Sequence, residues 1–367
     1  MGCISQSPFQ TTLSEYYSIL NMSSSASSKP RVILGLMTFG PDPNVGARVT
    51  SLEEFGECLD HLKGYGYNEV DTARMYLGGK QEEFTAAVGW KERGLSLATK
   101  VYPTSPGVHK PENLRKKVEE SLGNLQTDQV DIFYLHAADR SVPFAETLEE
   151  VNKLYQEGKF KRLGLSNYTS FEVAEIIIMC TERGWVRPSI YQAMYNAITR
   201  NIEQELIPCC HRYGLEIVVY NPLAGGILSG KYKPSTEKEI PQEGRFSDKN
   251  TTGELYRQRY MNLPVLDAIH TIVKPVADKH NLTLPEVAFR WLNHHSKLRL
   301  GRDGILIGVS SVDQLDANIE AIQKNALPEE MISALDAAWM AVKAASPPYW
   351  HLDLNYTYDT EAALFKR

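Results

Sequence analysis

From Arg31 onward, short apolar runs alternate with longer amphipathic segments. The short runs stay apolar on both sides, which is typical of strands buried in a parallel sheet. The longer segments carry apolar residues three and four positions apart, which predicts helices with one face on a core. The eight short runs are VILGLMTFG, NEVDTARMY, LSLATKVYP, VDIFYLHAA, KRLGLSN, SIYQAMYN, LEIVVYNP and GILIGVSS.

Helix boundaries are marked by residues with known preferences at helix ends. Pro111 is suited to a helix start, because its missing N–H would have no partner there. Ser170 and Asn201 are expected to cap the segments SFEVAEIIIMCTERG and NIEQELIPCCHRYG, which both close on Gly. The remaining helices are predicted at Leu52–Leu62, Leu266–His280, Leu284–His295 and 328–345.

The chain has eight predicted strands, seven of them clearly followed by a helix, and eight is the number that closes a parallel barrel. A doubly wound open sheet would need a G-x-G-x-x-G turn after the first strand, and LGLMTFGPDPNVG does not fit that pattern. The predicted fold class is therefore α/β, a (β/α)₈ barrel over residues 30–345. The segment from Ala224 to Asn262 is too long for an ordinary connection, so we expect a functional loop after the seventh strand. Residues 346–367 are expected to form a C-terminal tail near the substrate pocket.

Charge and composition argue against several kinds of binding partner. A net charge of −6 gives no electrostatic reason to bind nucleic acid or acidic membrane, and no apolar run reaches the ~20 residues that span a bilayer. The five cysteines have no metal spacing, and adjacent His294 and His295 point in different directions on a helix, so no metal is expected. Free thiols favour a cytoplasmic protein. The Ser-rich residues 1–29 are expected to be a disordered tail.

Titratable residues stand at the ends of three consecutive predicted strands. Asp71 ends the second strand with Tyr76 five residues later, Lys100 ends the third, and His136 ends the fourth. A single titratable residue at the end of a strand more often caps a loop than takes part in catalysis. In a barrel, however, the carboxyl ends of the strands meet at one mouth, where active sites lie. The four side chains are therefore expected to converge.

This set suits the reduction of a carbonyl group, which needs a hydride on carbon and a proton on oxygen. Tyr76 can supply the proton, and a nearby ammonium from Lys100 is expected to lower its pKa. Asp71 would keep Lys100 charged and in position. His136 can donate to the developing alkoxide.

The chain resembles the aldo-keto reductase superfamily, and most of all its aflatoxin-aldehyde and succinic-semialdehyde reductase branch. The motifs DTARMY, LATK, YLH, GLSN, YQAMYN, YNPLAGGILSGKY and IGVSS carry this resemblance between about Arg31 and Tyr349. It implies NADPH-dependent reduction of aldehydes or ketones, with Asp71, Tyr76, Lys100 and His136 as a catalytic tetrad. A homodimer is also expected, because the relatives are often dimers.

The resemblance also implies a cofactor site. Ser166, Asn167 and Gln192 would hold the nicotinamide carboxamide, and Tyr220 would stack on its ring. The Gly-rich loop after the seventh strand suits close approach to a pyrophosphate. The adenosine end lacks an acidic residue before Asp313, which favours NADPH over NADH. The remaining residues assigned to the cofactor are Met37, Thr38, Asp71, Asn221, Pro222, Leu223, Ala224, Gly225, Leu228, Gly230, Lys231, Arg245, Gly308, Ser310, Ser311, Gln314 and Asn318.

The residues expected to contact the substrate differ in part from those of the related reductases. Tyr76, His136 and Trp350 are expected to touch the substrate, and Arg259 falls where related reductases bind an acidic group. Those relatives also tend to place an Arg after the terminal aromatic pair, whereas this chain has His351 and then a longer tail. Two readings stay open: a pocket for acidic aldehydes, or a wider aromatic pocket lined by Trp350, Tyr356 and Tyr358.

Two other functions remain open at this point. A cofactor-binding regulatory subunit, like the potassium-channel β subunits of the same superfamily, would keep the NADPH residues with little turnover. A barrel lyase or isomerase that forms a Schiff base on Lys100 would need neutral, apolar surroundings for this lysine, and Asp71 argues against it.

Overall fold

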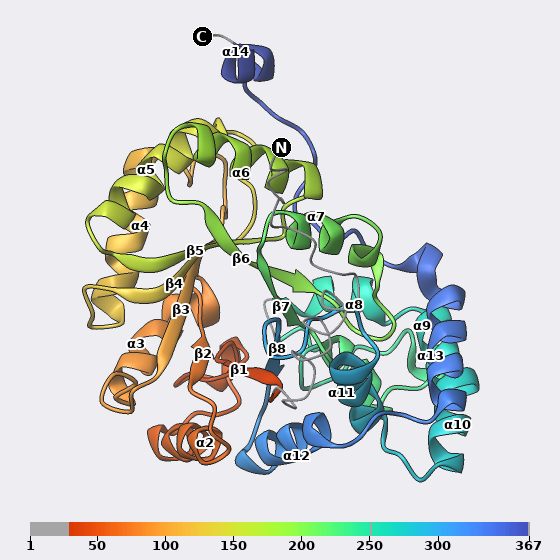
Figure 1. Cartoon of the computed structure of the whole chain (residues 1–367). Coiled ribbons are helices and arrows are strands. Elements are labelled where there is room, and N and C mark those ends of the chain that lie inside the picture. Colours follow the sequence, from red (N-terminus) through yellow and green to blue (C-terminus); the bar gives the residue numbers. More distant parts are fainter. Residues whose placement is uncertain (1–28, 250–251, 366–367) are drawn as a thin grey trace, which may run out of the picture.

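The computed structural model describes residues 29–249 and 252–365. Eight parallel strands form a closed barrel in the order β1 to β8, and helices surround it, as Figure 1 shows. This confirms the predicted (β/α)₈ barrel. The strands are β1 Arg31–Gly35, β2 Glu69–Asp71, β3 Ser96–Val101, β4 Val130–Leu135, β5 Phe160–Ser166, β6 Pro188–Met194, β7 Glu216–Tyr220 and β8 Gly304–Gly308.

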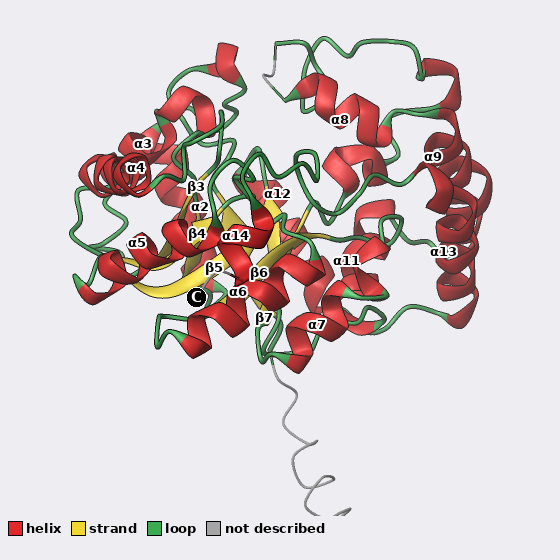
Figure 2. Cartoon of the chain, turned by 90° about the horizontal axis from the view of Figure 1, so that it is seen from above, coloured by secondary structure: helices red, strands yellow, loops and turns green. Residues whose placement is uncertain are grey.

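Each predicted amphipathic segment contains a helix, and the structure adds further helices between and after them. In Figure 2, α9 and α13 lie along the same outer side of the barrel. The α-helices are α2 Leu52–Gly64, α3 Gln81–Ala87, α4 Pro111–Asn124, α5 Phe144–Gln156, α6 Ser170–Glu182, α7 Leu206–Arg212, α8 Gly253–Tyr260, α9 Leu263–Asp267, α10 Lys274–Lys279, α11 Leu284–His294, α12 Val312–Gln323, α13 Glu329–Val342 and α14 Thr360–Phe365. Shorter 3₁₀ segments are η1 Pro43–Val45, η2 Tyr76–Gly79, η3 Asn201–Glu203, η4 Ala224–Ser229, η5 Pro234–Thr236 and η7 Lys343–Ala345, while η6 Ala268–Val273 is a π-helix.

Two predicted caps were wrong. The cap of α6 is Thr169, one residue before Ser170, and it forms a reciprocal capping box with Glu172. Asn201 does not cap α7, which begins at Leu206. The reason is Pro208: a residue without an N–H is tolerated only in the first turn, so α7 starts shortly before it.

The long segment after β7 contains η4, η5 and α8, so the predicted insertion has structure of its own. The tail after α13 crosses the barrel toward α6 and ends in α14, which stands apart from the barrel in Figure 1. The predicted disordered tail at 1–29 lies outside the described residues except for Lys29, whose ammonium sits 3.9 Å from the ring centre of Tyr67. In the described part of the chain, every helix is too short or too polar to cross a membrane.

The barrel interior is filled by side chains at alternate strand positions. Ile33, Ala98, Ile132, Ile190 and Val218 pack together there, with the ring of Tyr134 above them. Since successive side chains on a strand point to opposite faces, residues two positions further on also point inward. This alternation carries Lys100, His136, Gln192 and Tyr220 to the mouth of the barrel.

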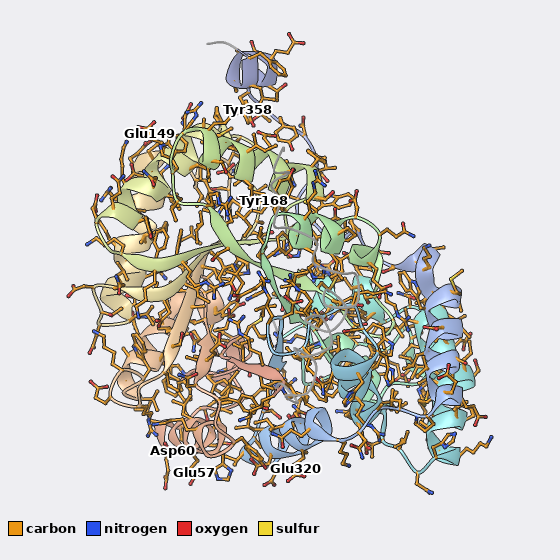
Figure 3. All side chains as sticks on the ribbon, viewed as in Figure 1. Glu57, Asp60, Glu149, Tyr168, Glu320 and Tyr358 are labelled. Atoms are coloured by element: carbon orange, nitrogen blue, oxygen red, sulfur yellow. The ribbon has the colours of Figure 1, made fainter. Side chains whose placement is uncertain are left out.

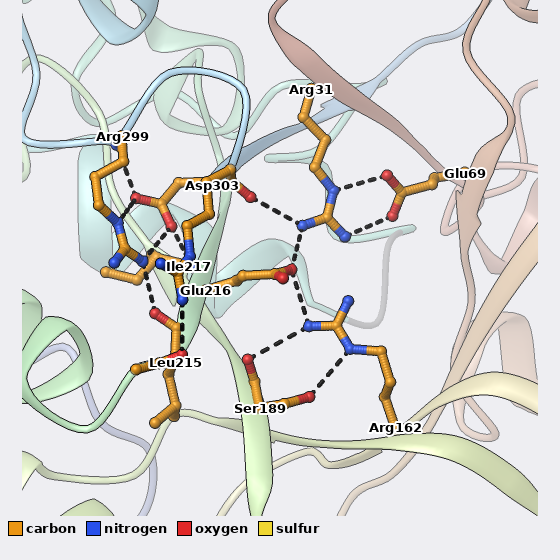
Figure 4. Close-up of polar contacts among 11 residues, drawn as sticks. Arg31, Glu69, Arg162, Ser189, Leu215, Glu216, Ile217, Arg299 and Asp303 are labelled. Atoms are coloured by element: carbon orange, nitrogen blue, oxygen red, sulfur yellow. Dashed lines mark hydrogen bonds and ion pairs between the residues drawn. The ribbon is translucent and has the colours of Figure 1, made fainter. Parts of the chain in front are cut away.

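A network of ion pairs closes the opposite, amino-terminal end of the barrel. Arg31 on β1 pairs with Glu69 of β2 at 2.7 Å and with Glu216 of β7 at 2.7 Å. Arg162 of β5 pairs with the same Glu216 at 2.8 Å, as Figure 4 shows. Beside them, Arg299 pairs with Asp303 at 2.9 Å. These charges tie strands together at the end remote from the mouth.

Candidate active site

A buried ion pair stands at the centre of the mouth. The Lys100 ammonium donates to the Asp71 carboxylate and to the Thr72 carbonyl oxygen, the latter at 2.7 Å. Both side chains are almost completely buried. Burial raises the pKa of Asp71 and lowers the pKa of Lys100, and the attraction between them opposes both shifts.

Tyr76 lies above this pair in η2. The Lys100 ammonium is 5.2 Å from the centre of its ring. The pKa of Tyr76 is raised well above its ordinary value, first by burial and then by the charge of Asp71. The prediction of a lowered pKa was therefore wrong, because desolvation of the phenolate outweighs the attraction of Arg245. Tyr76 keeps its proton.

His136 follows β4 and lies between two aromatic rings. Its ring is 6.0 Å from that of Tyr76 and 5.3 Å from that of Tyr102, in edge-on arrangements. Its Nδ1 is buried and has no hydrogen-bond partner among the described residues. Burial and the charge of Lys100 hold the pKa of His136 well below its usual value, so the imidazole is neutral. A neutral imidazole can donate one N–H to a ligand oxygen.

Two amides and a phenol hydroxyl, at the ends of β5, β6 and β7, form what we call the amide wall beside Asp71. Gln192 donates to Asp71 at 2.8 Å, and Asn167 donates to the His136 carbonyl oxygen at 2.8 Å and to the Ser166 hydroxyl at 2.9 Å. The Tyr220 hydroxyl donates to Asn167 at 2.7 Å. Gln192 does not end its strand, since β6 continues two residues further to Met194. Its side chain points into the barrel because Ile190, two positions earlier on the same strand, also points inward.

The segment after β7 has the backbone conformation expected of a loop that lies close to a pyrophosphate. Asn221, Ala224, Gly225 and Gly226 all have positive φ, and a Cβ at Gly226 would meet nothing within 4 Å. The Asn221 amide nitrogen is buried without a partner among the described residues. Pro222, Leu223, Leu228, Gly230 and Lys231 belong to the same turn region.

Several of the residues assigned to the cofactor lie around the start of α12. Ser311 caps this helix by accepting from the Gln314 N–H at 3.3 Å. The backbone and hydroxyl of Ser310 both donate to the Gln314 side chain at 3.0 Å. Asn318 is buried one turn further on, and Gly308 is open to space. Nearby, Thr38 donates to the Val309 carbonyl oxygen at 2.8 Å.

The substrate-side residues meet at the other edge of the mouth. Arg259, on α8, donates to His351 Nε2 at 2.8 Å. Two residues assigned to the cofactor also meet, since Arg245 approaches the sulfur of Met37 at 3.2 Å. Trp350 packs edge-on against Tyr349 at 5.2 Å.

The wider aromatic pocket is not formed by the tail tyrosines. Tyr356 donates to Glu172 of α6 at 2.6 Å and packs on Phe144 of α5. Figure 3 places Tyr358 beyond α6, toward α14.

Sequence reasoning missed two residues of this site. Tyr102 packs on the ring of His136, and the alternation that turns Lys100 inward applies equally two residues later. Tyr256 donates to Asn221 at 3.1 Å and lies between Arg245 and Arg259, at 5.1 and 6.0 Å from its ring centre. No local signal marked Tyr256, because only the fold of the insertion brings it here.

The fold and this mouth define a barrel oxidoreductase. Residues 31–340 match the family model of the Aldo/keto reductase family. The chain is 39% identical over 335 residues to mouse aflatoxin B1 aldehyde reductase member 2, covering 89% of each chain. It is 40% identical over 332 residues to the aldo-keto reductase pigE of Monascus ruber, covering 87% of this chain and 97% of the relative. An aldo-keto reductase of Pseudocercospora fijiensis is 42% identical over 297 residues, which cover 80% of this chain and 99% of the relative. The chain therefore belongs to the aldo/keto reductase family.

Proposed function

We propose that this oxidoreductase reduces aldehydes to alcohols, with NADPH as the hydride source and Tyr76 as the proton donor. The observation that carries the proposal is the convergence of Tyr76, His136 and the Lys100–Asp71 pair at the carboxyl ends of β2, β3 and β4. The family and the names of the aldehyde reductase relatives support the same reaction class.

The amide wall fits a nicotinamide. Asn167, Gln192 and Tyr220 present hydrogen-bonding groups beside Asp71, and the Asn221 amide nitrogen is unpartnered among the described residues. Gly226 of η4, where a Cβ would meet nothing within 4 Å, leaves room for a phosphate near the backbone. NADPH, when bound, would supply a hydride to the carbonyl carbon.

Each side chain then has a part in handling the carbonyl oxygen. Tyr76, which holds its proton because its pKa is raised, donates that proton to the oxygen as negative charge develops. Neutral His136 donates an N–H to the same oxygen. Lys100 stabilises the resulting phenolate, and Asp71 holds Lys100 in place.

A panel of aldehydes and ketones, followed by the loss of NADPH absorbance, tests the reaction. Tyr76→Phe should lower kcat by about 10²–10⁴-fold and leave the Kd for NADPH unchanged, because only the proton donor is removed. Tyr155→Phe is the matched control, since Tyr155 is exposed on α5. A Tyr76→Phe enzyme that reduces a reactive aldehyde at the wild-type rate would exclude Tyr76 as the donor.

A further inference from the structure

Arg140, in the loop after β4, joins the C-terminal tail to α6. It is only 4% exposed, and its Nε and Nη2 donate to the Glu172 carboxylate at 2.7 and 2.9 Å. The remaining nitrogen, Nη1, donates to three consecutive carbonyl oxygens of the tail: those of His351 at 2.9 Å, Leu352 at 3.4 Å and Asp353 at 3.3 Å. Because a guanidinium holds its donors in a rigid planar fork, this one side chain fixes the tail relative to α6.

The tail has a backbone conformation that fits this arrangement. Leu352 has a φ of 63°, which is uncommon for a leucine and turns the chain so that successive carbonyl oxygens reach the same nitrogen. Further along, the Thr357 N–H donates to the Arg140 carbonyl oxygen at 3.0 Å, and the Tyr356 hydroxyl donates to Glu172 at 2.6 Å. The Arg140–Glu172 pair is therefore bound by the tail from both directions.

The tail fixed in this way contacts the loop between β5 and α6. The backbone N–H of His351 donates to the Asn167 carbonyl oxygen at 3.1 Å, at the beginning of this loop. At its end, the backbone N–H of Ser170 donates to the Tyr349 hydroxyl at 3.0 Å. The tail thus supplies a hydrogen-bond partner on each side of the loop.

Asn167 is the residue that this loop presents to the mouth. Its φ of 60° lies in the left-handed region, and the residue is 1% exposed. Such a conformation is sparsely populated and persists only where the surroundings fix it. The side-chain amide of Asn167 bonds to the His136 carbonyl oxygen at 2.8 Å and to the Tyr220 hydroxyl at 2.7 Å. Its orientation in the amide wall therefore depends on a backbone that the tail helps to hold.

We infer that Arg140 is a positioning residue for the nicotinamide: by fixing the tail on the loop after β5, it holds Asn167 in the orientation that receives the carboxamide of NADPH. The inference rests on the proposed function and deepens it, because it gives the tail a part in binding the cofactor. A binding group that is ordered before the ligand arrives gives higher affinity than one that must be ordered on binding.

The test measures the Kd of two probes by isothermal titration calorimetry. NADPH carries the nicotinamide, and adenosine 2′,5′-bisphosphate lacks it. Arg140→Met should raise the Kd for NADPH about 10-fold, because Asn167 must then be ordered on binding. The Kd for the bisphosphate should change less than about 2-fold, because the residues proposed for the adenosine end lie at the start of α12, away from the tail.

Arg290→Met is the matched control. Arg290 on α11 also joins a glutamate to backbone carbonyl oxygens, since it pairs with Glu286 at 2.6 Å and donates to Asn325 at 2.6 Å and Ala326 at 2.7 Å. These bonds lie at the opposite end of α12 from Ser311. The control should lower the melting temperature and leave both Kd values at the wild-type level.

The outcomes separate the inference from the proposed function. If Arg140→Met weakens both probes equally, or weakens neither, Arg140 serves stability alone and the inference is wrong. If Arg140→Met does not fold, Arg140→Lys replaces it: lysine keeps the charge beside Glu172 but loses the planar fork, and an unchanged Kd for NADPH contradicts the inference equally. If the wild type binds no NADPH and reduces no aldehyde of the panel, the proposed function itself fails.

Discussion

At the scale of single residues, Gly164 shows how closely the barrel interior is packed. A methyl group at this position would overlap the ring of Tyr134, which fills the interior below the mouth. Gly164→Ala should therefore lower the free energy of unfolding by about 1–3 kcal/mol through overpacking. Urea unfolding measures this change. Gly123→Ala is the control: its Cβ would meet nothing within 4 Å on helix α4, so this substitution should be neutral or stabilising by roughly 0.5–1 kcal/mol. Equal effects at the two positions would contradict the packing argument.

His109 gives a pH dependence at the same scale. It is 1% exposed, and burial lowers its pKa from 6.5 to about 4. Above pH 6.5 the ring is neutral in both states. As the pH falls from 6.5 toward 4, the unfolded chain binds a proton that the folded protein does not, so stability falls by up to about 1.4 kcal/mol per pH unit.

The measurement is the free energy of unfolding of wild type and His109→Gln at pH 7 and pH 5. The loss between these values should be smaller in the variant by roughly 2 kcal/mol, because glutamine does not titrate. A loss of the same size in both proteins would show that other groups cause the acid sensitivity.

At the scale of elements, the segment that contains η4 and α8 connects the proposed phosphate site with Arg259. Lys231, exposed just after η4, is placed to meet a phosphate. Lys231→Ala should weaken NADPH binding about 10-fold, chiefly through faster release. Stopped-flow fluorescence measures the release rate. Lys233→Ala, two residues further along and equally exposed, should leave the rate unchanged, and a similar acceleration in both would indicate a general charge effect.

At the scale of the whole molecule, the two ends of the barrel have different tasks. Arg31 joins β1, β2 and β7 at the end remote from Lys100. Arg31→Met leaves Glu69 and Glu216 partly buried with one partner fewer, so we expect a loss of about 2–3 kcal/mol in stability. kcat/KM should stay at the wild-type value at temperatures where the variant is folded.

The control for Arg31 is Lys80→Met, which breaks an exposed pair with Glu83. Exposed pairs of this kind contribute little, so stability should change by less than about 1 kcal/mol. A fall in kcat/KM of folded Arg31→Met would show that the two ends are coupled.

The sequence by itself determined the barrel and most of its mouth. Short runs that are apolar at every position specify strands of a parallel sheet. The amphipathic segments that follow them specify the helices that cover this sheet. Since strand ends meet at one mouth, the positions of Asp71, Lys100 and His136 could be predicted from the ends of the runs. Capping preferences predicted the starts of helices less accurately. The expected cap of α7 was wrong because Pro208 requires the helix to begin later.

Only the tertiary structure decided the pKa values of the site and the contacts of the residues expected to bind the substrate. The pKa of Tyr76 rises because burial outweighs nearby cations, and burial of a side chain is a property of the packed fold. Arg259 and His351 lie 92 residues apart, yet they meet because Arg140 and Asn167 fix the tail across the mouth. No periodicity or motif records such a contact, since it depends on how the insertion and the tail fold onto the same barrel.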